Sequence, residues 1–110
     1  MIILTKKITD QLIDNHKHNA GEDVSPVVKL FGGSSCTWLL TELDPESDIA
    51  FGLCDLGMGS PELGYVSMAE LRSIKFPPFG LPIERDLHWE AEKSIYNYAQ
   101  ESRHLGYINT

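Results

Sequence analysis

The sequence predicts an α+β fold: a small antiparallel sheet of four or five strands with an N-terminal helix, a short inserted helix and a C-terminal helix. Segments with the composition of strands follow one another between residues 27 and 66, and helix signals lie on both sides of them. The links at 44–48 and 57–61 are too short for the crossover that parallel neighbours need, so the central strands should be antiparallel. A chain of 110 residues without a repeat or linker is expected to form one domain, residues 1–110.

The N-terminal helix is expected to follow Thr5, whose hydroxyl can cap it, and to run to about Asn15. Residues 19–26 have the composition of a loop. β-Branched and aromatic residues then predict four strands in succession: VVKLF (27–31), TWLLTEL (37–43), IAFGLCDL (49–56) and ELGYV (62–66). In the third of these, the odd-numbered residues 49–53 should share one face of the sheet.

The glycine-rich loop GMGSP (57–61) raises the question of phosphate binding. A phosphate-binding loop leads into a helix and carries a Lys, whereas this one leads into another predicted strand and has no Lys, so it is expected to be a hairpin turn. Gly52 and Gly64 lie inside predicted strands, near Asp55 and Glu62. Glycines there mark either sheet curvature or a surface that a ligand approaches, and the sequence leaves both interpretations open.

A short inserted helix is predicted by the best local signal in the chain. Ser67 and Glu70 have the spacing of a capping box, which predicts a helix from Met68 to about Ile74. The proline-rich segment FPPFGLP then breaks the chain.

The last strand is expected in IERDLHW (83–89), followed by the C-terminal helix. Glu90 and Glu92 suit the first turn of that helix, and Gly106 is expected to end it. Its apolar face is formed by Ala91, Ile95, Tyr98, Ala99 and Leu105.

The charge of the chain is the most informative part of its composition. The formal net charge is -7 and the pI is about 4.9, which argues against direct binding to a nucleic acid. Residues 42–92 hold eleven Asp and Glu against three basic residues, a net charge of -8 for that stretch. Such a surface can serve solubility or a basic partner.

The compartment is expected to be the cytoplasm. No apolar run is long enough for a transmembrane helix, and MIILTKK does not resemble a secretory signal, so no contact with a membrane is expected. The two cysteines, Cys36 and Cys54, are too few for a disulfide framework and are expected to be reduced.

Three long motifs, TWLLTELDPE, DIAFGLCDLGMGSPELGYVSMAEL and GLPIERDLHWE, resemble the domain-of-unknown-function family numbered 2958. The resemblance covers about residues 27–105. It implies a small protein of bacterial mobile elements or phages, in the neighbourhood of anti-restriction and DNA-transfer functions. It implies no established reaction and assigns no catalytic residues.

The first functional hypothesis is a non-catalytic acidic interaction protein. The acidic stretch would bind a basic nucleic-acid-binding protein, as a DNA-mimic inhibitor of a host defence protein does in anti-restriction or anti-CRISPR activity. This hypothesis needs no cofactor, and it leaves the oligomeric state open. The expected partner-binding residues are Glu42, Asp44, Glu46, Asp48, Glu84 and Asp86.

The alternative is a small ligand-binding or metal-dependent enzyme domain that uses a divalent cation. On an extended strand Glu84 and Asp86 would share one face, and such carboxylates can bind a hard cation or act as acid and base. The candidate catalytic residues of this alternative are Asp55, Glu62, Glu84, Arg85 and Asp86. No metal site is assigned, since no third ligand accompanies the histidines of NHKHN (15–19). Whether the protein is an enzyme stays undecided.

Overall fold

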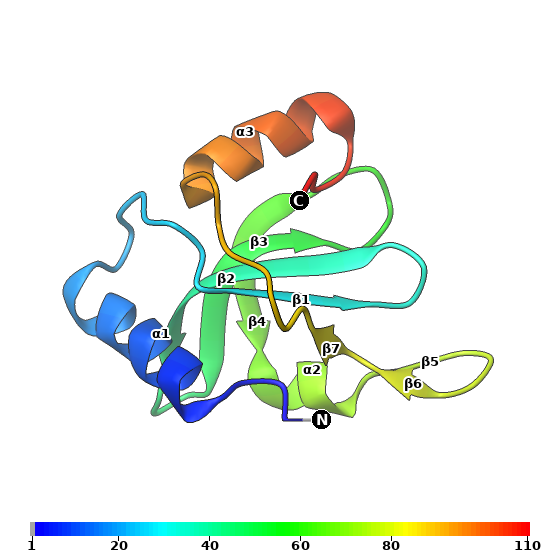
Figure 1. Cartoon of the computed structure of the whole chain (residues 1–110), viewed down its shortest axis with the longest axis horizontal. Helices are drawn as coiled ribbons and strands as arrows, with labels where there is room; N and C mark the ends of the chain where they lie inside the picture. Colours follow the sequence, from blue (N-terminus) through cyan, green and yellow to red (C-terminus); the bar gives the residue numbers. More distant parts are fainter. Residues whose placement is uncertain (1) are drawn as a thin grey trace.

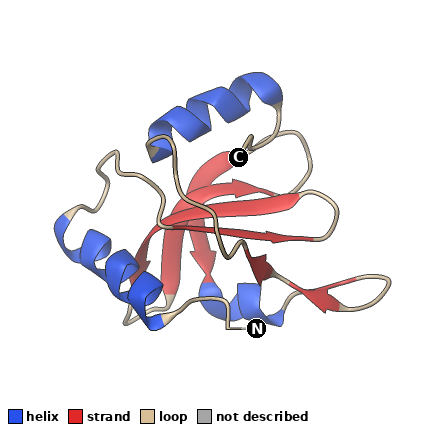
Figure 2. Ribbon diagram, viewed as in Figure 1, coloured by secondary structure: helices blue, strands red, loops and turns tan. Residues whose placement is uncertain are grey.

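Five antiparallel strands form the central sheet of the computed structural model, which describes residues 2–110 (Figures 1 and 2). The strand order is β4-β3-β2-β1-β7, and β5 and β6 form a separate two-stranded hairpin. The predicted α+β fold with its three helices is confirmed. In chain order the elements are α1 (Lys6–His18), β1 (Val28–Gly32), β2 (Cys36–Asp44), β3 (Ile49–Asp55), β4 (Glu62–Ser67), α2 (Met68–Ser73), β5 (Lys75–Phe76), β6 (Leu81–Pro82), β7 (Glu84–Arg85) and α3 (Ile95–Leu105).

The sheet separates two apolar cores, and Figure 1 shows it between α1 and α3. Trp38 and Leu40 of β2 pack in one core with Leu12 of α1. Leu39 packs in the other core, together with Ile95 of α3. Successive side chains of a strand point to opposite faces, so β2 supplies both cores and is apolar along most of its length.

The predicted helix signals are confirmed at three ends. The Thr5 hydroxyl accepts a hydrogen bond from the backbone N–H of Ile8 at 3.2 Å, and that of Ser67 accepts from Glu70 at the same distance. Gly106 ends α3 in the left-handed conformation, with φ of 80°. The helix α1 runs to His18, three residues beyond the predicted end, because its last turn is held by tertiary contacts rather than by an apolar repeat.

The segment after α2 departs from prediction. The expected strand 83–89 is reduced to β7, which pairs only with Leu30 and Phe31 of β1 before the chain turns toward α3. The expected break at 76–82 instead contains most of the β5–β6 hairpin, which projects from the body of the protein (Figure 1).

The start of α3 also departs from prediction. Ser94 caps the helix, and the N–H of Ile95 donates to the carbonyl of Val24 at 2.9 Å. Glu90 and Glu92 therefore precede the helix, and their expected place in its first turn is wrong. Ala91 also lies outside the helix, and Leu105 is 43% exposed; the buried face of α3 is formed by Ile95, Tyr98, Ala99 and Ser102. Among residues 2–110 no helix is both long and apolar enough to cross a membrane.

A β-bulge interrupts the pairing of β2 with β3. Leu40 lies opposite Gly52, whereas Glu42 lies opposite Phe51, so Thr41 is an extra residue without a cross-strand partner. Gly52 and Gly64 pair across β3 and β4. A Cβ on Gly52 would collide with the carbonyl oxygen of Leu39, so this glycine is required by the close approach of the β2 backbone. Of the two interpretations of these glycines, the bulge supports sheet curvature.

We expect Gly52→Ala to lower the free energy of unfolding by about 1–3 kcal/mol, since the new methyl group must displace backbone. The paired variant Gly64→Ala is the control, because no atom lies within 4 Å of its added Cβ. That variant should be neutral or raise stability by about 0.4–1 kcal/mol. Urea denaturation of the three proteins tests this, and equal stabilities would contradict the role given to Gly52.

Candidate functional site

The bulge changes which face of the sheet the last residues of β2 occupy. In an unbroken strand Glu42 and Asp44 would point into the core beside α1, and the bulge turns them to the other face. Beyond Thr41, Leu43 returns to the core of α1, so Glu42 and Asp44 point to the opposite face. Their neighbours follow from the register. Across β2, β3 and β4 the first row is Glu42, Phe51 and Tyr65, and the second row is Asp44, Ile49 and Ser67.

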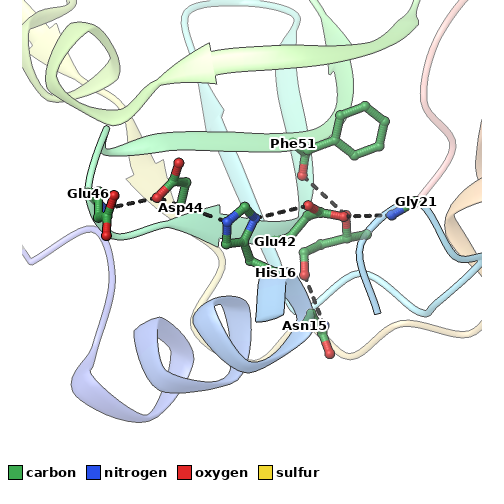
Figure 3. A network of polar contacts seen from close by, with 8 residues as sticks. Asn15, His16, Gly21, Glu42, Asp44, Glu46 and Phe51 are labelled. Carbon is green, nitrogen blue, oxygen red and sulfur yellow. Dashed lines mark hydrogen bonds and ion pairs between the residues drawn. The ribbon is translucent and has the colours of Figure 1, made fainter. Parts of the chain in front are cut away.

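The helix α1 packs against β2 and supplies one wall of this site. The pairing of β1 with β2 ends where Val28 faces Leu40, so the following residues of β2 lack a strand on that side. There the side-chain amide of Asn15 donates to the carbonyl oxygen of Thr41 at 2.9 Å (Figure 3). A backbone carbonyl that the bulge leaves outside the ladder thus keeps a hydrogen-bond partner.

His16 lies between the two carboxylates (Figure 3). Its Nδ1 is 3.5 Å from Oε1 of Glu42, and its Nε2 is 3.9 Å from Oδ1 of Asp44. The other oxygen of Glu42 accepts the backbone N–H of Gly21 at 3.2 Å. Glu42 is only 9% exposed, and these two contacts join it to both α1 and the loop that follows α1.

Asp44 is the more accessible carboxylate, with 36% of its side chain exposed. It accepts the backbone N–H of Glu46 at 2.9 Å. This hydrogen bond, together with one from the Ser47 side chain, holds the pKa of Asp44 below its usual value, because both favour the charged form. Asp44 is therefore negatively charged at neutral pH.

These residues line a hollow of about 190 Å³, which we call the sheet hollow. The rings of Phe51 and Tyr65 have their centroids 5.0 Å apart and are tilted by 60°. The hollow is smaller than the roughly 300–1,000 Å³ of pockets for drug-sized ligands, so it suits one side chain or a small amine. Its lining residues are His16, Glu42, Asp44, Ser47, Ile49, Phe51 and Tyr65.

A larger hollow of about 990 Å³ lies beside the first turns of α1, against Val27 and Trp89. Its charged residues have both signs, Lys6 and Lys7 against Asp10 and Asp14. Lys6 and Asp10 pair with each other at 2.7 Å. Because the charges offset one another, this hollow does not select a ligand by its charge.

The six expected partner-binding residues fall into two groups. Four lie in residues 42–48, the end of β2 and the turn to β3, which we call the acidic turn. Glu46 is exposed there, and Asp48 pairs with Arg72 at 3.0 Å.

The other two lie far along the sheet. Glu84 of β7 faces Phe31, which faces Thr37 at the start of β2, whereas Asp44 ends that strand. The separation is about 20 Å along the strand direction. Asp86 follows Glu84, and its carboxylate is 3.8 Å from Nζ of Lys29. One partner contact centred on the acidic turn does not have to include them.

The residues of the enzyme alternative are not brought together. Asp55 is buried and accepts the N–H groups of Gly57 at 2.8 Å and Ile108 at 3.3 Å. Arg85 donates to the carbonyl oxygens of residues 2 and 3, at 2.6 and 2.8 Å. Asp55 thus holds the C-terminal segment, and Arg85 holds the N-terminal one. Glu62 and Glu84 are exposed, on strands at opposite edges of the sheet. Within residues 2–110 no group of three or more His, Cys, Asp or Glu side chains could hold a metal ion.

Neither cysteine is an activated nucleophile. Burial raises the pKa of the Cys54 thiol to about 11. The pKa of Cys36 is also raised, by burial and by the negative charge of Asp55. Both thiols are free and are protonated at neutral pH, and the protonated thiol is a poor nucleophile.

Sequence reasoning placed Glu42 and Asp44 in the site but missed His16, Phe51 and Tyr65. The available signal was Gly52, because an in-strand glycine often marks a bulge. Without the register, that signal does not say which side chains the bulge redirects.

The fold and the site define a small α+β domain with an acidic turn beside an aromatic hollow. A family model described as "Protein of unknown function (DUF2958)" matches residues 3–109. The chain therefore belongs to this family, and the resemblance seen in its motifs is confirmed over nearly the whole length. Comparison with curated proteins and with solved structures found no match.

Because Asp55 holds the C-terminal segment, Asp55→Ala should lower the free energy of unfolding by about 1–3 kcal/mol, since it leaves the buried N–H of Ile108 without a partner. Hydrogen exchange at the Ile108 amide should also become faster. Glu62 is an exposed carboxylate among the same candidate catalytic residues. The free energy of unfolding of Glu62→Ala should stay within about 0.5 kcal/mol of the wild-type value. Equal effects of the two variants would contradict the anchoring role.

The raised pKa of Cys54 predicts slow alkylation of the folded protein. In a Cys36→Ser background at pH 8, iodoacetamide should modify Cys54 about a hundredfold more slowly in the native protein than in urea, since its pKa is about 11 instead of 9.0. The native rate should keep rising as the pH approaches 11. Mass spectrometry measures both rates, and equal rates would show that the thiol is not shielded.

Proposed function

We propose that this protein is a non-catalytic acidic interaction protein that binds a basic nucleic-acid-binding protein through its acidic turn. The observation that carries the proposal is the concentration of four carboxylates in residues 42–48, at one end of the sheet. Arg72 pairs with Asp48, and the imidazole of His16 lies against Glu42 and Asp44. A negative surface of this kind attracts basic clefts and speeds encounter with them.

The charge of the whole chain supports the same proposal. The net charge of -7 disfavours contact with phosphates and favours partners that normally bind them. Two residues of the competing catalytic set, Asp55 and Arg85, are engaged in holding the chain ends. This supports an interaction role over chemistry at those residues.

The biological setting that we propose comes from the family resemblance. In a bacterial mobile element or phage, an acidic protein of this size would act in the host cytoplasm as a DNA-mimic inhibitor of a defence protein. Anti-restriction and anti-CRISPR activity are the two forms of this role. In both, the acidic turn would compete with the nucleic acid for the partner's nucleic-acid-binding surface.

The test is capture of a partner by the tagged full-length chain from a nuclease-treated bacterial lysate, with identification by mass spectrometry. The retained protein is then purified and titrated with wild type, Glu46→Lys and Glu84→Lys. Glu46→Lys reverses an exposed charge in the acidic turn, and Glu84→Lys makes the same change on β7. We expect Glu46→Lys to weaken binding about tenfold or more and added salt to weaken it further.

Three outcomes would contradict the proposal. If the tagged chain retains no nucleic-acid-binding protein, the proposed partner is contradicted. If Glu46→Lys binds as the wild type does, or if binding does not depend on salt, the acidic turn is not the binding surface. Loss of binding with Glu84→Lys alone would move the contact to β7.

A further inference from the structure

We propose that the sheet hollow binds the side chain of an arginine presented by the basic partner. This inference rests on the proposed function and adds the chemistry of the contact. The hollow combines an aromatic floor, a negative wall and a size suited to a single side chain, and a guanidinium group complements all three.

The aromatic part of the hollow is open to solvent. Tyr65 is 75% exposed, although its ring lies against Phe51 with the centroids 5.0 Å apart. An exposed tyrosine held by an aromatic neighbour presents a ring of defined orientation at little further cost in side-chain entropy. A guanidinium plane stacks on such a ring through cation–π attraction.

The negative part comes from two carboxylates on adjacent pleats of β2. Asp44 is negatively charged at neutral pH and has 36% of its side chain exposed at the rim. Glu42 adds its carboxylate from the wall, where 12% of its side chain is exposed and its two oxygens contact His16 and the N–H of Gly21. A cation entering the hollow meets an accessible carboxylate beside an aromatic face.

This combination favours arginine over lysine. A lysine ammonium group is a compact, strongly hydrated charge, whereas a guanidinium group is planar, more weakly hydrated and able to stack and donate hydrogen bonds together. The volume of about 190 Å³ leaves no room for a nucleotide or a longer peptide. The rest of such a partner would remain outside, over the acidic turn.

The experiment is a titration of the ¹⁵N-labelled full-length protein with N-acetyl-arginine methylamide, followed by amide NMR shifts. Two matched ligands serve as controls. The citrulline compound keeps the shape of arginine but has no charge, and the lysine compound keeps the charge but lacks the planar guanidinium group. We expect the arginine compound to shift amides of Ile49, Phe51 and Tyr65. The lysine compound should bind more weakly, and the citrulline compound should cause no shift at these positions.

Two variants with matched controls assign the contact. Tyr65→Ala and Asp44→Asn should each weaken arginine binding by about three- to tenfold. Tyr107→Ala removes another exposed tyrosine, and Glu84→Gln removes a carboxylate on β7; both should bind as the wild type does. All four positions are at least partly exposed, and the amide spectra show whether each variant keeps the fold.

Arginine shifts confined to another surface, equal shifts with citrulline, tighter binding of lysine, or unchanged affinity in Tyr65→Ala would each overturn the inference. The two experiments distinguish failure of one proposal from failure of the other. If partner capture depends on Glu46 but arginine does not enter the hollow, the arginine inference fails and the interaction function stands. If arginine enters the hollow and no basic partner is retained, the hollow is an arginine-binding site, but the interaction function fails and so does the assignment of that arginine to a basic partner.

Discussion

The extra residue at Thr41 is the constraint on which the site depends. One residue inserted into β2 exchanges the faces of everything that follows it, because side chains alternate with a period of two. Leu43 thereby joins the core of α1, and two carboxylates move to the open face beside Phe51 and Tyr65. An unbroken strand would direct those carboxylates into the apolar core, where unpaired charge is strongly unfavourable. The same insertion therefore protects the core and creates the acidic side of the hollow.

The bulge is in turn held by groups that lie far from it in sequence. The carbonyl of Thr41 accepts from Asn15 and its hydroxyl donates to the carbonyl of Phe51, so both oxygens of the extra residue have hydrogen-bond partners. Gly52 lets the β2 backbone approach β3 at this point. Glu42 extends the same network to the loop after α1 through Gly21. The position of α1 and the geometry of the site are thus parts of one arrangement.

Charged residues that the sequence alone does not distinguish have different physical roles in the fold. Asp55 and Arg85 satisfy backbone groups of the two terminal segments and so connect the chain ends to the sheet. Glu46, by contrast, is exposed in the turn. A buried carboxylate with backbone donors stabilises the fold, whereas an exposed one shapes the field that a partner meets. Burial and partners, and not residue type, separate Asp55 and Arg85 from the exposed Glu46, whereas Glu42, buried and bonded to Gly21 beside the hollow, belongs to both groups.

The sequence by itself determined the elements whose signals are local. Thr5 and Ser67 cap helices through residues three positions away, Gly106 ends α3, and the short links at 44–48 and 57–61 require antiparallel neighbours. Only the tertiary structure decided the bulge, the shortness of β7, the late start of α3 and the contact of His16 with Glu42. The contacts of α1 with Thr41 and Glu42 span 26 positions, and the hydrogen bond from Ile95 to Val24 spans a still longer stretch of chain. Spacing within a segment cannot report such contacts, because they arise when packing of the two cores brings distant segments together.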